Sequence, residues 1–129
     1  MQESSHADWW AFKAFMHNPA GMTLTNGATG RFIAANQAFL DLTGFWRAHV
    51  IGATSEELGL WPERARRSEI GASLGELGQV GPLLGSLRHR TGRLISCAFV
   101  FKLLHDEQDR FSVLTTIVPR SWFDEPVAQ

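Results

Sequence analysis

Residues 31–52 read RFIAANQAFLDLTGFWRAHVIG and combine a strand signal, a helix cap and a helix stop. The apolar run at residues 32–35 predicts a short strand that ends at Asn36. Asn36 can cap the helix that follows, because its side-chain oxygen can accept a hydrogen bond from a free N–H of the first turn. Gly44 ends that helix as a residue free to adopt the left-handed backbone conformation. The stretch therefore predicts a strand followed directly by a short helix.

The order of residues in and after this stretch resembles the core of a PAS domain. The matching residues in the stretch are Asn36, Phe39, Thr43, Gly44, Phe45, Ile51 and Gly52. The runs Glu57-Leu58-Gly59-Leu60-Trp61 and Arg90-Thr91-Gly92 are similar to later landmarks of the same family. Together these motifs cover residues 20–118, and their order and spacing make the match specific. The resemblance implies a sensory or regulatory module, and by itself no particular chemistry.

The resemblance implies an α+β, PAS-like fold, in which a five-stranded antiparallel sheet carries helices over one face and an N-terminal cap helix. Strands are expected at residues 22–25, 31–35, 83–90, 94–104 and 111–118, and further helices at 55–60 and 63–77. We expect an N-terminal capping or dimerisation helix in residues 1–19, the PAS domain in 20–120 and a tail in 121–129. The last strand ends in Ile117-Val118-Pro119-Arg120, where many PAS domains have an Asp–hydrophobic–Thr turn.

The N-terminal segment predicts an amphipathic helix from a cap at Asp8 to about residue 17. Trp9, Phe12, Phe15 and Met16 fall on one stripe at helical spacing. Two interpretations stay open, namely a helix packed on its own domain and a dimer contact. The second follows from the resemblance, because in PAS proteins the segment before the first strand often covers the outer sheet face or a partner.

The strand at residues 94–104 is apolar on both faces, which indicates cover on both sides. One face carries Ile95, Cys97, Phe99 and Phe101, and the other carries Leu94, Ser96, Ala98, Val100 and Lys102. By similarity to PAS domains we place the bulkier set inward, toward the helices. The smaller set is then expected under the first helix or a partner chain.

Composition favours one globular domain of 129 residues, with 44% hydrophobic and 19% charged residues. A net charge of −1 does not point to nucleic acid or an anionic membrane surface. No apolar run reaches the roughly 18 residues of a spanning helix, and the N-terminus lacks the features of a signal peptide. We therefore expect a cytoplasmic chain, and the single cysteine, Cys97, agrees with a reducing compartment.

Catalytic and metal-binding patterns are not evident in the sequence. Cys97 should lie opposite a residue near Gly85 on the preceding strand, too far from His89 for that imidazole to act as its base. The histidines are scattered without metal-ligand spacing. We therefore predict an inert thiol, no metal and no enzymatic activity, and a small enzyme is the least favoured of three functional hypotheses.

The resemblance also bears on cofactors. Haem-binding PAS domains usually supply an axial His from the long helix, and residues 63–78 contain no His. Blue-light PAS relatives carry a reactive Cys in the short helix before it, and residues 54–61 contain no Cys. Haem and a covalently reactive flavin are therefore disfavoured, whereas a non-covalent flavin is not excluded.

The expected ligand pocket lies between the sheet and the helices. Its predicted lining is Phe39, Leu42, Trp61, Ile70, Leu74, Ile95, Cys97 and Phe99, with Ser96 or Thr116 as polar groups. The alternative is that these residues are simply core. Gly71 and Gly75 in the long helix allow two interpretations, a mobile pocket wall or close packing and fraying.

The leading hypothesis is a sensory module that binds a small apolar molecule and regulates an output domain or partner by dimerisation. Such an output could be a histidine kinase or a diguanylate cyclase, as in two-component signalling. The main alternative is a constitutive dimerisation module that binds no ligand. An apolar cavity favours the first hypothesis, and a fully packed interior favours the second.

Overall fold

The computed structural model describes residues 2–62 and 64–123, and only the backbone of residues 2–5 and 64–67. The strands are β1 Gly21–Asn26, β2 Phe32–Ala35, β3 Gln79–Arg88, β4 Leu94–His105 and β5 Phe111–Pro119. The helices are α1 Gln2–Met16, α2 Gln37–Thr43, α3 Arg47–Val50, α4 Ser55–Leu58 and α5 Arg64–Leu77, followed by the 3-10 turn η1 Arg120–Trp122. The five strands form one antiparallel sheet in the order β2-β1-β5-β4-β3.

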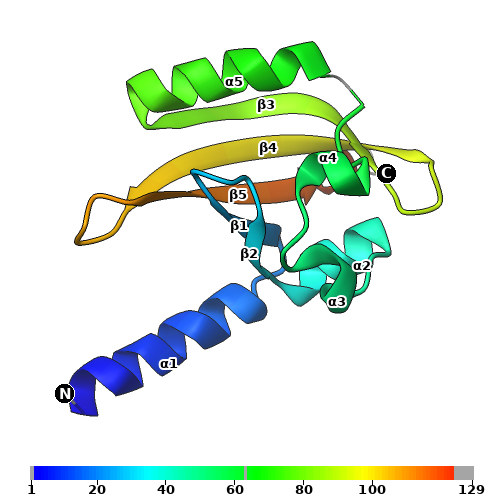
Figure 1. Ribbon diagram of the computed structural model, residues 1–129. Coiled ribbons are helices and arrows are strands. Elements are labelled where there is room, and N and C mark those ends of the chain that lie inside the picture. Colours follow the sequence, from blue (N-terminus) through cyan, green and yellow to red (C-terminus); the bar gives the residue numbers. More distant parts are fainter. Residues whose placement is uncertain (1, 63, 124–129) are drawn as a thin grey trace.

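The predicted α+β architecture is confirmed, with helices α2 to α5 on one side of the sheet and α1 projecting from it (Figure 1). The third strand begins earlier than expected, at Gln79, because its register with β4 shifts between Val80 and Leu83 and hides the alternation. Helix α3 was not predicted, since a single turn carries no periodic signal. Residue 63 of the expected long helix and residues 124–129 of the expected tail lie outside the described residues.

Asn36 joins three segments through its side-chain amide. Its Oδ1 accepts hydrogen bonds from the backbone N–H groups of Met22 (2.9 Å) and Phe39 (3.0 Å), so it caps α2 as predicted and also holds β1. Its Nδ2 donates to the carbonyl oxygens of Phe15 and Ala20, both at 2.9 Å. The side chain is fully buried. This one amide therefore fixes the junction of α1, β1 and α2.

Gly44 ends α2 as predicted, with φ 78° and its N–H donating to the Leu40 carbonyl oxygen at 2.8 Å. The position also excludes any side chain, because a Cβ there would lie 2.6 Å from Nε2 of His89. Arg90 Nε donates to the Gly44 carbonyl oxygen at 2.7 Å. The end of α2 is thus held against the turn between β3 and β4.

The two faces of β4 differ as predicted. Cys97, Phe99 and Phe101 are at most 8% exposed and belong to the core beneath the helices. Leu94, on the opposite face, is 56% exposed. The bulkier set therefore points inward, and the outer face of the sheet remains apolar.

Helix α1 differs from the expectation of a capping helix. It begins at Gln2 rather than after Asp8, and it extends away from the sheet (Figure 1). Trp9 is 49% exposed and Phe12 is 59% exposed. Among the described side chains, Phe15 and Met16 at the end of the stripe are half-buried, whereas Trp9 and Phe12 are exposed. Both interpretations of this helix, packing on its own domain and a dimer contact, therefore stay predictions.

Replacing Asn36 by Ala should lower the free energy of unfolding by about 3 kcal/mol or more, because it leaves several enclosed backbone groups without partners at about 1–3 kcal/mol each. Gln37→Ala is the matched control, since Gln37 is exposed and bonds only Asp41 within the same helix. We expect that control to change stability by less than about 0.5 kcal/mol. Urea denaturation measures both, and equal losses would refute the central role of Asn36.

Candidate functional site

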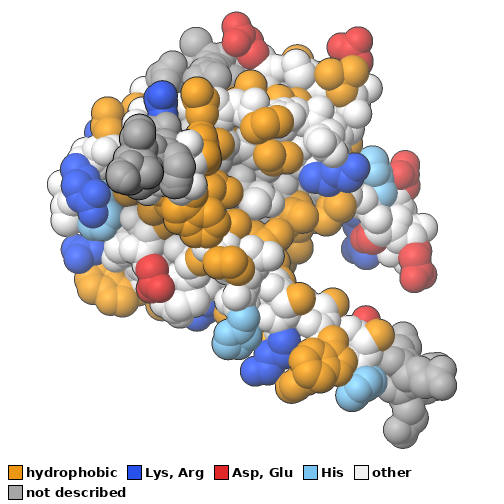
Figure 2. Space-filling model, turned by 180° about the vertical axis from the view of Figure 1, so that it is seen from behind, with side chains coloured by type: hydrophobic (Ala, Val, Ile, Leu, Met, Phe, Trp, Pro, Cys, Tyr) orange, Lys and Arg blue, Asp and Glu red, His pale blue; other side chains and the backbone are white. Residues whose placement is uncertain are grey.

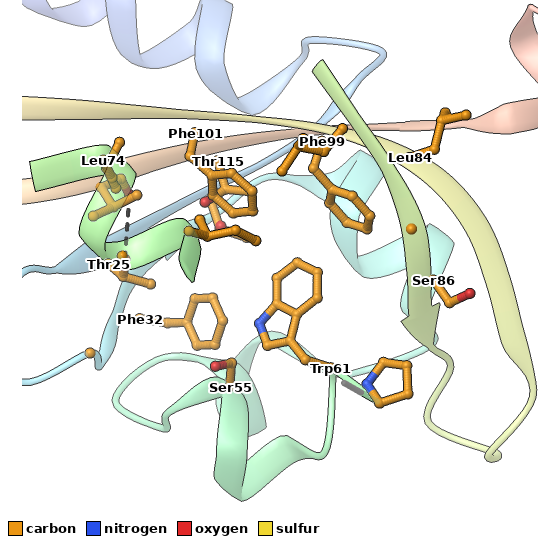
Figure 3. A pocket seen from close by; sticks show the side chains of 18 residues that line it. Thr25, Phe32, Ser55, Trp61, Leu74, Leu84, Ser86, Phe99, Phe101 and Thr115 are labelled. Atoms are coloured by element: carbon orange, nitrogen blue, oxygen red, sulfur yellow. Dashed lines mark hydrogen bonds between the residues drawn. The ribbon is translucent and has the colours of Figure 1, made fainter. Parts of the chain in front are cut away.

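A cavity of about 210 Å³ lies between the inner face of the sheet and the segment that includes α5 (Figure 3). Every strand contributes to its wall. The described lining residues are Thr23, Thr25, Gly30, Phe32, Ser55, Trp61, Pro62, Ile70, Gly71, Leu74, Leu83, Leu84, Gly85, Ser86, Phe99, Phe101, Val113 and Thr115. None of these is charged, and none is His or Cys. The described part of the wall is therefore apolar, with hydroxyl groups as its only polar side-chain atoms apart from the Trp61 indole N–H.

Aromatic rings form the centre of the wall. The Trp61 ring lies edge-on to Phe99, with centroids 4.9 Å apart, and 6.2 Å from Phe101. Phe99 and Phe101 are near-parallel at 6.2 Å. Such an arrangement presents both ring faces and ring edges to a guest, which suits a flat aromatic molecule.

The loop that carries Trp61 is held by caps and by β3. Helix α4 has a capping box between Thr54 and Glu57. Beyond it, the carbonyl oxygens of Gly59 and Leu60 accept hydrogen bonds from Arg88, at 3.1 Å from Nε and 2.8 Å from the backbone N–H. This connection positions Trp61 over the sheet.

The threonines of the wall were missed by the sequence analysis, which named Ser96 and Thr116 instead. Thr115 lies opposite Phe101 in the register of β4 and β5, whereas Thr116 lies opposite Val100. Since alternate residues face opposite sides, Thr115 shares the inner face with Phe101, and Thr116 and Ser96 belong to the outer face. The alternation together with the strand pairing was the signal that could have found Thr115.

Four of the eight predicted lining residues contribute to the cavity: Trp61, Ile70, Leu74 and Phe99. The other four, Phe39, Leu42, Ile95 and Cys97, lie in or against the hydrophobic core and are not among the lining residues. Helix α2 packs too tightly on β1 to leave a space between the two elements, because a Cβ at Gly21 would lie 3.2 Å from the Phe39 Cα. A role of these residues in ligand binding stays a prediction.

Cys97 lies opposite Gly85 in the sheet, as predicted, and its side chain is fully buried. Burial raises the pKa of its thiol from 9.0 to about 11. The nearby imidazole is engaged elsewhere, since His89 Nδ1 lies 2.9 Å from the Thr91 hydroxyl. The thiol is therefore protonated near neutral pH, and no described residue offers it a base within reach.

The described residues contain no group of three or more His, Cys, Asp or Glu side chains that could hold a metal ion. They also contain no helix long and apolar enough to cross a membrane.

The sequence matches no protein-family model, and it matches no curated protein. Solved structures, in contrast, resemble it closely in fold. A PAS domain from a two-component sensor histidine kinase has a TM-score of 0.77 at 12% identity, over 91% of this chain and 99% of that one. The PAS domain of a protein from Colwellia psychrerythraea has a TM-score of 0.76 at 17% identity, over 85% and 93%.

An RNA-binding light-oxygen-voltage receptor has a TM-score of 0.74 at 18% identity over 87% of this chain. This chain spans only 33% of that receptor. These likenesses, together with the five-stranded antiparallel sheet, establish that the chain has the fold of a PAS domain.

Alkylation tests the state of the single cysteine. We expect iodoacetamide to modify Cys97 in the native protein at least about a hundredfold more slowly than in denaturing urea, since two pKa units alone reduce the thiolate fraction by that factor. Equal alkylation rates in the native and denatured chain would contradict the enclosed thiol.

The raised pKa of Cys97 in the folded state also predicts a pH dependence of stability. The thiol's contribution to the free energy of unfolding should be lost as the pH rises from 9.0 toward 11.

Proposed function

We propose that this chain is a PAS sensory module that binds a small, uncharged, mainly apolar molecule in the cavity beneath α5. The observation that carries the proposal is the aromatic-lined space of about 210 Å³. An apolar cavity of about 150 Å³ is known to hold benzene, so this one has room for a molecule of one or two rings. The proposed ligand contacts are Trp61, Ile70, Leu74 and Phe99 from the sequence, together with Thr23 and Thr115 of the sheet.

Helix α5 is the proposed mobile wall. Its Ile70, Gly71 and Leu74 border the cavity. Close packing does not explain its glycines, because a Cβ at Gly71 or Gly75 would meet nothing within 4 Å. Each glycine weakens the helix by about 1 kcal/mol relative to alanine. A wall weakened in this way can shift when the cavity fills.

Dimerisation is the proposed route of output. The outer face of the sheet exposes Leu94 and Leu104, and Figure 2 shows apolar side chains gathered on this side of the molecule. The aromatic stripe of α1 is likewise exposed. Together they suit a second copy of the chain. The activity of an attached or associated kinase or cyclase would then respond to changes in the dimer. The proposed location of the chain is cytoplasmic.

A constitutive dimerisation module is the second candidate, and the same exposed apolar surfaces favour it. The two candidates differ in whether the cavity is occupied. Native mass spectrometry of the purified chain distinguishes them, since it reports bound small molecules and the oligomeric state in one measurement.

Leu74→Trp tests the cavity. Leu74 is 6% exposed and borders the space, so a larger side chain there should fill it. With 2-ethylnaphthalene as an uncharged probe, burial of roughly 300 Å² contributes about 7.5 kcal/mol before a cost of association of about 4 kcal/mol or more, which predicts binding in the millimolar range. We expect the variant to lose at least about tenfold in affinity, equivalent to about 1.4 kcal/mol.

Leu77→Trp is the matched control, because Leu77 lies one turn further along α5 and is 71% exposed. Isothermal titration calorimetry should give this control the wild-type affinity. Unchanged binding by a folded Leu74→Trp variant would place the probe outside the proposed cavity.

A double variant, Trp9→Ala with Phe12→Ala, tests the dimer. We expect the wild type to sediment as a dimer at micromolar concentration and the variant as a monomer, because two exposed aromatic anchors are removed. Ala14→Ser is the control, since helical spacing puts Ala14 on the opposite side of α1. A monomeric wild type would refute the dimer, and a dimeric variant would remove α1 from its interface.

A further inference from the structure

Thr23 and Thr115 form a hydroxyl pair in the sheet wall of the cavity. They are direct partners in the register of β1 and β5, the two strands at the centre of this wall. Both border the cavity, and they are only 2% and 6% exposed. Figure 3 shows Thr115 on the sheet side, with the Trp61 ring across the cavity.

Neither hydroxyl has a hydrogen-bond partner among the residues that the structure describes. The neighbouring threonines differ, since Thr25 donates to the Val113 carbonyl oxygen at 3.4 Å and Thr43 to the Phe39 carbonyl oxygen at 2.9 Å. No fully enclosed side-chain nitrogen or oxygen of the described residues lacks a partner. The hydroxyls of Thr23 and Thr115 therefore open onto the cavity.

Two hydroxyls that open side by side onto an apolar cavity favour an occupant that can bond both, because an apolar occupant would enclose them without a partner. Each hydroxyl can donate one hydrogen bond, and a carbonyl oxygen has two lone pairs that can accept both. A carboxylate is a poor candidate, because the described wall supplies no positive charge to offset its desolvation. The rest of the wall is made of aromatic and aliphatic side chains.

We propose that the cavity recognises a neutral aromatic carbonyl compound of one or two rings, whose carbonyl oxygen accepts hydrogen bonds from Thr23 and Thr115. This assignment rests on the proposed ligand-binding function and specifies its ligand class. The ring system lies among Trp61, Phe99 and Phe101, where it can stack or meet ring edges. The hydroxyl pair thus sets the orientation of the ligand, and the aromatic wall supplies most of the affinity.

The test compares two probes that differ only at the carbonyl group, 2-acetylnaphthalene and 2-ethylnaphthalene. Calorimetry should show the ketone binding the wild type about tenfold more tightly, the value expected for one to two net hydrogen bonds. In the double variant Thr23→Val, Thr115→Val, which keeps the side-chain shape, we expect the ratio of the two affinities to fall to about one. Its thermal midpoint should not fall, because two unpartnered hydroxyls are removed.

Thr25→Val is the matched control, since Thr25 borders the same cavity from the same strand but its hydroxyl is already bonded. This control should keep the wild-type preference for the ketone. Equal affinities of the two probes for the wild type would refute the hydroxyl anchor while leaving the ligand pocket in place. A water that bridges the two threonines would give this result. If the double variant still prefers the ketone, the carbonyl oxygen is bonded by another donor, such as the Trp61 indole N–H. Binding of neither probe would overturn the proposed function itself and the anchor with it.

Discussion

The side-chain amide of Asn36 is the interaction on which the rest of this fold depends. It satisfies backbone groups of the α1 end, of β1 and of the first turn of α2 at the same time. The Asn36 side chain is fully buried, so removing its amide leaves these backbone groups without the partner that they have in the folded chain. Because β1 lies between β2 and β5, this junction also sets where the inner face of the sheet meets the helices.

The interior on that inner face is filled unevenly. Around α2 it is close-packed, since Gly21 lets the backbones of β1 and α2 approach closely and Phe39 fills the space between them. Under α5 it is open, because large rings that meet edge to face leave a space that this helix does not fill. The same fold therefore contains a close-packed region around α2 and a region with a cavity beneath α5. A ligand would change the region with the cavity without disturbing the Asn36 junction.

Two apolar surfaces lie outside this core, namely the aromatic stripe of α1 and the outer face of the sheet. Trp9 and Phe12 on the helix and Leu94 and Leu104 on the sheet are exposed. The hollow interior and the outer surface are separated only by the sheet, since the inner residue Phe101 and the outer residues Val100 and Lys102 are neighbours on β4. A change in the curvature of that sheet would therefore alter both of its faces, and the proposed ligand could affect the proposed dimer in this way.

The sequence by itself determined the local features of this protein. The cap at Asn36, the stop at Gly44 and the inward set on β4 depend on residues close together along the chain, so each could be predicted from spacing and residue type. The tertiary structure alone decided the direction of α1, which depends on long-range bonds to its end and not on its own amphipathic pattern. It also decided the cavity wall. Thr23 and Thr115 come together only through the register of two strands far apart in sequence. Phe39 and Cys97 lie in the core and Leu42 and Ile95 pack against it, because the place of a space depends on how whole elements meet.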